Sequence, residues 1–510
     1  ILMPKRKDAP PEFAAEGEIT ADALRGRMER GDDAVFTPFS VGGDAGPRAT
    51  AAFIDGLVST NTVYDFILRP LASGRALGRV KTGSEAVALI MEGRVFHGRK
   101  RLCRTMEAVV EEMLSGAVVV IFEGECAAVA FEAPGFEKRG ITEPTSENVL
   151  KGSKESFVEA LRVNTALVRR RVKTSDLKIR ELTVGRRTGT RVAIVYVEGI
   201  ANSETVEKVV KRFRDVDTDG LTTAAQIETI LYERRYTLFP QALYTERPDR
   251  FVGNLIEGRV GIIIDGMPIT YITPIDVHTF LQAPEDYAHH FVLSSLFRIM
   301  RYACAVASLV LPAFYVSVTT YHQEMIPTKL AVSIISSKQG APFPTYMEVA
   351  LMLLAFEVLL EAGMRLPRAV GQAVSIVGAL VVGQAAITAN ILSPGVVIVI
   401  SAAGITGFVV PSQDLSNAGR AFRLALVAFA SVGGLFTTTL GLVLILYNMC
   451  SIEVFGTPYF APFAGSEGVR MLDDTVTRRA WTFKRRRPAD ISPEDSVRHG
   501  SGTFKKDGSS

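Results

Sequence analysis

Long apolar runs dominate the chain between Arg301 and Leu446, whereas the residues before Phe291 and after Gly456 are of ordinary or strongly charged composition. The apolar part divides into several stretches. Each is close to the length of about 17 to 25 residues that a helix needs to cross a bilayer. The pattern therefore predicts a water-exposed region of roughly 290 residues, followed by a bundle of about five hydrophobic helices.

The expected membrane spans differ in length and in their small residues. The fourth lies near the lower length limit, so we expect it either to tilt little or to cross only part of the bilayer. Glycines such as Gly433 and Gly434 in the fifth favour close packing of helix backbones. The five spans are 301–320, 346–363, 369–390, 395–410 and 421–446.

Three glutamates in the second span are the candidates for an ion path or for gating. A carboxylate at membrane depth costs about 2.5 kcal/mol or more, so it needs a partner, a proton or water. Glu361 can pair with Arg365 at the helix end, and Glu348 can lie near the headgroups at the other end. Glu357 is then the best candidate for an ion path, with Gln384 in the third span as a further polar group that avoids lipid.

The sidedness of the spans is left open by the charges. With the first region inside, five spans keep the arginines that flank them on the inner side, as the positive-inside rule requires. An odd number, however, places the basic C-terminal tail outside. If the second segment is re-entrant, the tail returns inside, but Arg365 and the loop with Arg420 and Arg423 move outside.

The water-exposed region contains an internal repeat. Residues 52–63 resemble 195–206 at an offset of 143, and residues 114–124 resemble 256–266 at an offset of 142. In the first pair a buried strand ends in an acidic residue and glycine before a helix. In the second, a helix leads through a glycine into two strands. Two matches at nearly one offset predict a duplicated α/β unit, although chance similarity between short β-hairpins is the alternative.

The predicted fold class is therefore an α/β N-terminal region of two similar subdomains, joined to an all-α transmembrane helical bundle. The basic helix between the two subdomains ends in Arg169, Arg170 and Arg171, where cations suit the helix dipole. The expected parts are a partly disordered extension (1–47), subdomain 1 (48–132), a linker with the basic helix (133–190), subdomain 2 (191–290), the transmembrane domain (291–455) and a basic tail (456–510).

The acidic-glycine pairs that recur in both copies are interpreted as turns and not as a metal or catalytic site. No glycine-rich phosphate loop or nucleophile motif stands between a strand and a helix, and the four cysteines form no CxxC pair. We expect no enzyme activity, no metal and no cofactor. The four pairs are Asp55-Gly56, Glu123-Gly124, Glu198-Gly199 and Asp265-Gly266.

The net charge of +3 is small, so no nucleic-acid partner is expected. The cations are nevertheless concentrated near the C-terminus, where Arg485, Arg486 and Arg487 follow Lys484. Next to a membrane domain such a cluster favours contact with anionic lipid headgroups. A solvated tail without a partner is the alternative.

Several phrases of the sequence are similar to the GerA family of spore germination proteins. Among them are Glu246-Arg247-Pro248 and Ala283-Pro284-Glu285-Asp286-Tyr287. The resemblance covers the chain from about Glu143 to Pro488, with the phrases in the family's order. Further phrases lie at 156–171, 254–260, 342–344, 361–367, 383–386 and 455–462.

This resemblance implies an A subunit of a nutrient-responsive germinant receptor, a multi-pass protein of the spore inner membrane. Such a subunit would form a homo-oligomer with a ligand-gated cation channel, and would assemble with a transporter-like B subunit and a lipoprotein C subunit. Two alternatives stay open. One is an accessory germination protein of the SpoVAF type, and the other is a non-conducting membrane scaffold that recruits germination partners.

Overall fold

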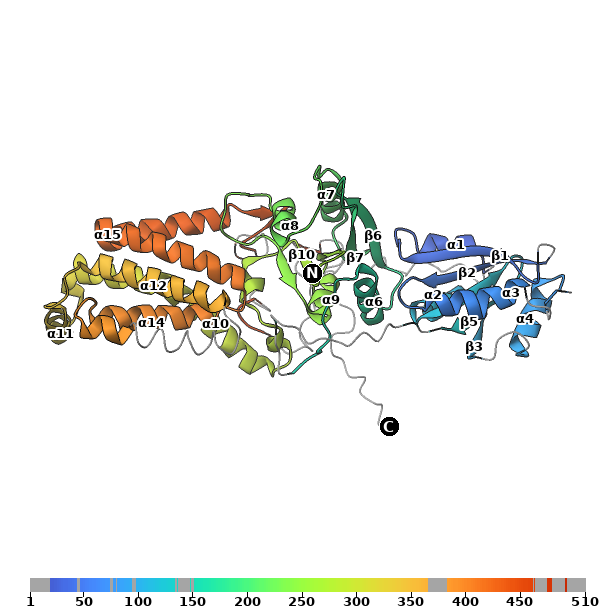
Figure 1. The fold of residues 1–510 in the computed structure, drawn as a ribbon, viewed down its shortest axis with the longest axis horizontal. Coiled ribbons are helices and arrows are strands. Elements are labelled where there is room, and N and C mark those ends of the chain that lie inside the picture. Colours follow the sequence, from blue (N-terminus) through green and yellow to red (C-terminus); the bar gives the residue numbers. More distant parts are fainter. Residues whose placement is uncertain are drawn as a thin grey trace, which may run out of the picture. The chain divides into compact units, whose positions relative to one another are not determined.

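The computed structural model divides into two compact units, which are described one at a time (Figure 1). The first consists mainly of residues 1–230 and 244–273 and includes 491–496. The second consists mainly of 274–490 and includes 231–243. Placement is described for residues 19–43, 46–73, 77–78, 80–93, 98–133, 135, 147, 151–365, 383–461, 463, 475–478 and 491–492.

Two five-stranded sheets of identical topology form the first unit. The strand orders are β1-β2-β4-β5-β3 and β6-β7-β9-β10-β8. The first sheet consists of β1 (Ala34–Ser40), β2 (Arg48–Ile54), β3 (Lys100–Cys103), β4 (Ala117–Phe122) and β5 (Ala128–Glu132). The second consists of β6 (Leu177–Val184), β7 (Thr190–Val197), β8 (Leu243–Thr245), β9 (Val260–Ile264) and β10 (Thr270–Thr273).

Corresponding strands of the two sheets begin 142 or 143 residues apart, such as β1 at 34 and β6 at 177, so the sequence repeat reflects two copies of one fold. The strands pair antiparallel, as in β1–β2 and β6–β7, which corrects the α/β class to an α+β arrangement in each copy. Each copy also begins earlier than predicted. β1 lies in the expected extension (1–47), and β6 lies in the expected linker (133–190).

Helices cover both faces of the first sheet, which explains why its strands are apolar without alternation. On β4, Val118 and Val120 belong to one core cluster, whereas Val119 and Ile121 belong to the other. Because both faces are buried, every β4 side chain avoids water. The helices of this unit are α1 (Ala21–Arg27), α2 (Thr60–Thr62), α3 (Arg69–Ser73), α4 (Gly83–Met91), α5 (Met106–Leu114), α6 (Leu161–Arg171), α7 (Ser203–Arg214), α8 (Ala224–Leu231) and α9 (Pro248–Ile256), with a π-helical turn at Val63–Leu68.

The four acidic-glycine pairs form turns in both copies, as predicted. Their glycines have φ of +89° at Gly56, +81° at Gly124, +78° at Gly199 and +86° at Gly266. Backbone in this left-handed region is open to glycine at little cost, whereas other residues are strained there. The recurring glycines are therefore explained by backbone geometry.

A buried ion pair joins the two copies. Arg169 of α6 donates from Nε and Nη2 to the carboxylate of Asp33, at 2.7 and 2.8 Å, and both side chains are fully buried. Beside it, Arg162 contacts Asp55 at 3.0 Å and also pairs with Glu181. Burial raises the pKa of Glu181, although Arg162 opposes this shift. The basic helix thus connects the two copies, and Arg169, the first arginine of the 169–171 run, is buried inside the unit.

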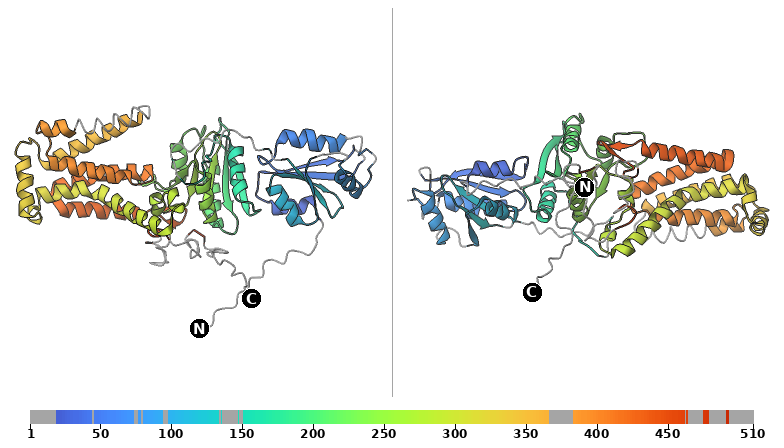
Figure 2. Two further views of the ribbon diagram at one scale, coloured as in Figure 1. Left: turned by 90° about the horizontal axis from the view of Figure 1, so that it is seen from below. Right: turned by 180° about the vertical axis from the view of Figure 1, so that it is seen from behind.

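The second unit is dominated by helices that lie side by side, with the short α11 across one end (Figures 1 and 2). These are α10 (Phe291–Thr320), α11 (Thr328–Lys338), α12 (Thr345–Arg365), α14 (Pro394–Phe408) and α15 (Gln413–Cys450). Short 3-10 turns lie at Val277–Leu281, Pro284–Tyr287 and Gln323–Met325. The strands β11 (Glu453–Val454) and β12 (Thr457–Pro458) form a small hairpin. Most of the predicted third span, 369–390, falls outside the described residues.

Within the described part, α10 and α15 are long and apolar enough to cross a membrane. α15, however, is not one straight helix. Gly433 (φ −149°, ψ 25°) and Gly434 (φ 62°, ψ −136°) interrupt it. An added Cβ on Gly441 would lie 2.8 Å from Leu426 Cδ2. Residues fifteen apart in a straight helix are about 22 Å apart, so the chain reverses and 435–450 packs against 413–432 (Figure 1). The predicted single span at 421–446 is corrected to a helical hairpin.

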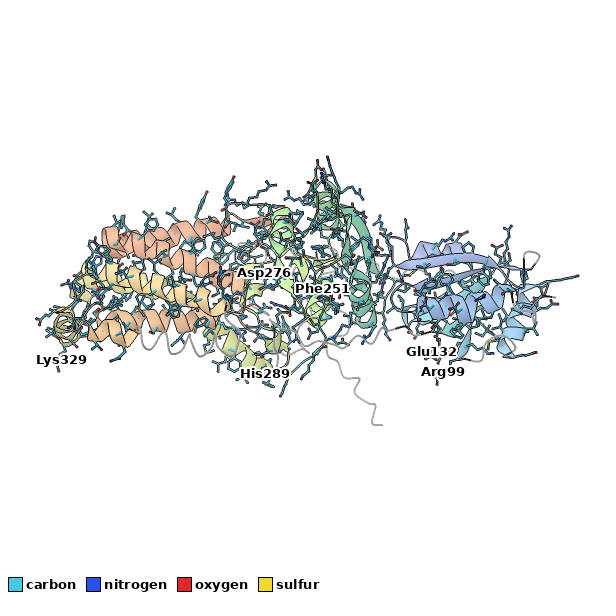
Figure 3. The ribbon with its side chains drawn as sticks, in the orientation of Figure 1. Arg99, Glu132, Phe251, Asp276, His289 and Lys329 are labelled. Carbon is cyan, nitrogen blue, oxygen red and sulfur yellow. The ribbon has the colours of Figure 1, made fainter. Side chains whose placement is uncertain are left out.

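The described long helices of this unit run between two ends. We call the end where α10 begins the near end and the end where it finishes the far end; Figure 3 shows His289 and Asp276 at the near end and Lys329 at the far end. α14 runs antiparallel to α10, since an added Cβ on Gly395 would contact Tyr315 and one on Gly407 would contact Ser308.

α12 runs in the same direction as α14. It starts at the far end, where Glu348 contacts Ser393, and ends at the near end beyond the contact of Glu357 with Arg420. The hairpin starts at the near end, turns at the far end and returns. Tyr321 at the end of α10 accordingly donates to the Ser431 carbonyl next to the turn, at 2.6 Å.

Gly434→Ala should destabilise the chain, because alanine is strained at φ +62° and its Cβ would lie 2.8 Å from Tyr321 Cβ. Strain of this kind costs about 1–3 kcal/mol. The matched control is Gly419→Ala in the same helix, where an added Cβ meets nothing within 4 Å. Thermal unfolding of the purified chain should show a lower midpoint for Gly434→Ala only. Equal midpoints for the two variants would contradict the hairpin.

Candidate functional site

A buried carboxylate at the base of α10 binds two arginines of that helix. Asp286 is 1% exposed, and it accepts from Arg298 Nε at 3.1 Å and from Arg301 Nη1 at 2.7 Å. The two arginines lie three residues apart, on one face of the helix. The 3-10 turn Pro284–Tyr287 carries Asp286 there, and the backbone N–H of Ala283 donates to the same carboxylate at 3.1 Å.

The C-terminal tail reaches this cluster through Arg478. Its guanidinium donates to the carbonyls of Asp286 and His289, and its backbone N–H donates to Ser295 Oγ at 2.9 Å. The Tyr287 ring lies 4.9 Å from the Arg478 guanidinium carbon and 5.5 Å from that of Arg298, within the range of cation–π attraction. We call Asp286, Tyr287, Arg298, Arg301 and Arg478 the base cluster.

His278 lies on the 3-10 turn Val277–Leu281 and is almost fully buried. Its Nδ1 is 2.8 Å from the Tyr302 hydroxyl, and its ring contacts Phe463 edge-on with centroids 4.9 Å apart. Burial lowers the pKa of His278, and the nearby carboxylate of Asp276 opposes this shift. The histidine is a hydrogen-bonding link between this turn and α10, and its burial disfavours the charged form.

At the far end, Glu348 is fully buried and caps another helix. Its Oε2 accepts from the backbone N–H of Ser393 at 2.8 Å and from the Ser393 hydroxyl at 2.7 Å. Ser393 is the N-cap residue of α14, where the helix dipole favours a negative charge. Lys338 Nζ lies 3.8 Å from the other carboxylate oxygen. These contacts account for Glu348 as a residue that positions α14.

Glu357 pairs with Arg420 across α12 and α15. Arg420 Nη1 donates to Glu357 Oε2 at 2.9 Å, and the two side chains are 19% and 40% exposed, respectively. One turn further along α15, the buried Arg423 donates to Ser308 Oγ of α10. Among the predicted ion-path carboxylates of the described part, only Glu357 both joins two long helices and is open to solvent.

The other predicted site residues are distributed along the surface. Glu361 accepts from Arg365 Nη2 at 2.6 Å, which is the pairing expected from their spacing, and both side chains are exposed. Gln384 is also exposed. Arg485, Arg486 and Arg487 lie outside the described residues. The structure therefore does not bring Glu348, Glu357, Glu361 and Gln384 together into one site.

Sequence reasoning missed both the base cluster and the partner of Glu357. Arg420 lies 63 residues from Glu357, so no local spacing connects them. Asp286 was visible only as part of a family phrase. A usable signal was nevertheless present, because two arginines on one face of a span need a counter-charge, and the acidic pair Glu285-Asp286 lies just before them.

Comparison with known proteins identifies the family. The family described as Bacillus/Clostridium GerA spore germination protein matches residues 22–490. The chain belongs to the GerA family. Among its relatives is Spore germination protein KA of Bacillus subtilis (strain 168), 35% identical over 470 residues, with 92% of this chain and 85% of that protein covered.

Another GerA-family relative is Stage V sporulation protein AF of the same organism, 30% identical over 448 residues and covering 88% of this chain and 89% of that protein. Among solved structures, the N-terminal domain of the A subunit of the Bacillus megaterium spore germinant receptor GerK3 matches with a TM-score of 0.40 and 28% identity, covering 50% of this chain and 92% of that one. A role in spore germination is thus supported for this GerA-family chain.

Asp286→Asn should strongly destabilise this GerA-family chain, because it leaves the buried Arg298 and Arg301 without their counter-charge. Breaking a buried pair from one side costs about 3–5 kcal/mol. Glu285→Gln is the matched control, since Glu285 is adjacent but only partly buried. Thermal unfolding of the purified chain should show a large drop in midpoint for Asp286→Asn and little change for Glu285→Gln. Similar midpoints would show that the cluster contributes little.

Proposed function

We propose that this chain is the A subunit of a nutrient-responsive spore germinant receptor, and that several copies enclose a gated path for monovalent cations. The germination role follows from the family, whereas the channel and its oligomer are the proposed part. The observation that carries the proposal is the Glu357–Arg420 pair, a partly exposed ion pair between α12 and α15. Charged groups at membrane depth are costly and mark ion pathways.

The mechanism is a shift between two arrangements of the packed helices. In the closed arrangement Glu357 is held by Arg420, so the carboxylate is not available to a passing cation. A nutrient bound to a partner such as the B subunit would favour an arrangement in which the pair separates and Glu357 faces the path. Glu348 and Glu361 stay in positioning roles, because each already has a local partner.

Five described passages of the chain between the near and far ends support a multi-pass membrane protein. They are α10, α12, α14, 413–432 and 435–450. The hairpin ends at the near end, and Arg478 of the tail lies there beside Ser295. The near end then holds Arg298, Arg301, Arg365, Arg420, Arg423 and Arg478, which satisfies the positive-inside rule for a near end on the inner side. The position of Arg478 beside these arginines supports the same sidedness for the tail and the start of α10.

An accessory germination protein of the SpoVAF type is the second candidate function. The 30% identity to Stage V sporulation protein AF over 88% of this chain favours keeping it. Such a protein would have the same fold and ion path, but it would not be a subunit of the receptor that responds to the nutrient. A non-conducting scaffold is the third reading, and it differs from both in passing no cations.

Glu357→Gln should reduce nutrient-triggered potassium efflux from proteoliposomes that contain the chain together with its partner subunits, by roughly tenfold, which corresponds to ~1.4 kcal/mol. The reason is the loss of the negative charge that attracts cations in the open state. Glu361→Gln, one turn away on α12 and exposed, is the matched control and should leave the efflux unchanged. Equal efflux from Glu357→Gln and the unmodified chain would exclude this residue, and no efflux from the unmodified chain would favour the scaffold.

The hairpin topology predicts that Cys126 and Cys450 react from the same side of a sealed vesicle with a membrane-impermeant maleimide. Both cysteines are exposed, and Cys450 ends the hairpin at the near end. Ser337→Cys on the exposed surface of α11 should react only from the opposite side. A single fifth span would instead put Cys450 on the side of Ser337→Cys, and that result would overturn the hairpin topology.

A further inference from the structure

The two copies of the α+β fold use one backbone carbonyl differently. Leu57 and Ile200 are equivalent, 143 residues apart, each just after the second strand of its sheet. In the first copy the Leu57 carbonyl accepts from the backbone N–H of Gly135 at 3.2 Å. In the second copy the Ile200 carbonyl accepts from Ser492 Oγ at 2.6 Å. Gly135 of the linker in the first copy and Ser492 of the C-terminal tail in the second copy thus donate to equivalent carbonyls.

A glycine beside each carbonyl shows that the framework is the same. Gly116 and Gly258 have φ of +93° and +99°, and an added Cβ would lie 3.3 Å from the Leu57 oxygen and 3.1 Å from the Ile200 oxygen, respectively. Only Gly258 also faces the tail, because its added Cβ would lie 3.0 Å from Ser492 Cβ. A side chain at this position would therefore press tightly against the tail, which would have to shift by a few tenths of an ångström.

The tail residues are held in the way that a bound peptide is held. Ile491 is 5% exposed and Ser492 is fully buried, and the Ser492 hydroxyl has its hydrogen bond to the Ile200 carbonyl. Both residues belong to the first unit, whereas Arg478, earlier in the tail, belongs to the second unit and is bound in the base cluster. The tail therefore has one anchor in each unit.

We propose that Ile200 and Gly258 form a docking site for a peptide segment on the second subdomain, and that its occupant is the C-terminal tail of the same chain at Ile491–Ser492. The site selects an apolar residue followed by a small hydroxyl residue, because the first is buried and the second fits against a glycine and donates to a carbonyl. The docking site does not depend on cation conduction.

Hydrogen–deuterium exchange of the purified chain tests the docking site. Ile491→Asp places a charge in a buried position, and it should speed exchange of the amides around Ser492 and Gly258 at least tenfold. Ile256→Asp is the matched control, because the same substitution falls two residues before Gly258 on a side chain that is 41% exposed. It should leave the tail protected. Unchanged exchange in β6 and β7 verifies that the Ile491→Asp chain is still folded.

The result that overturns docking is a tail that exchanges in the unmodified chain as fast as in Ile491→Asp. A second measurement identifies the occupant. Gly258→Cys with Ser492→Cys brings two Cβ positions close to the 3.5–4.5 Å of a disulfide, once the exposed Cys126 and Cys450 are replaced by serine. We expect a disulfide within one chain. A disulfide that forms only between differently tagged chains carrying one cysteine each would assign the site to the tail of a neighbouring copy and overturn the proposal.

Discussion

The neutralisation of buried charge at the base of α10 is the interaction on which the helical unit depends. Taking a guanidinium out of water costs several kcal/mol unless a counter-charge and hydrogen bonds replace the solvent. Asp286 supplies that charge to Arg298 and Arg301 at once. Because α10 contacts α12, α14 and both halves of α15, the orientation fixed by this carboxylate is passed on to the other helices.

One carboxylate does not balance the three arginines gathered at the base cluster. Arg478 is held instead by carbonyl oxygens and by the Tyr287 ring, which stabilise a cation without cancelling its charge. The five residues of the base cluster therefore keep a net positive charge among themselves. Cations at this position suit an anionic inner leaflet, so the residues that fix α10 would also help to orient the proposed membrane domain.

Local patterns were sufficient for many of the elements but not for their partners. The repeat at 142–143 residues, the glycine turns and the limits of α12 and α14 followed from periodicity and turn chemistry. The reversal at Gly433–Gly434 could not be read, because the sequence is apolar on both sides and composition alone does not distinguish a long span from a hairpin. β1 was missed for a similar reason. It is an edge strand with Pro38 in its interior, and proline lowers the strand signal even where an edge tolerates it.

Arg169 shows the same limit within the first unit. In sequence it belongs to a basic run at a helix end, where solvated cations are ordinary, yet its partner Asp33 lies 136 residues away in the other copy. The fully buried pair is possible only because the duplication places α6 against the first sheet's outer residues. Long-range ion pairs of this kind decide how duplicated parts join, and they leave no trace in the spacing of either partner.

Duplication also explains how segments far apart in the sequence can bind at equivalent positions of the two copies. Each copy presents a carbonyl beside a glycine, and such a position accepts any segment with a donor and little bulk. The first copy fills it with Gly135, which follows directly from its own last strand. The second copy is followed by the helical unit, so no such residue is at hand, and the tail fills the place after the chain has passed through the helices. A position that a nearby residue fills in the first copy is thereby filled by a segment remote in sequence in the second copy.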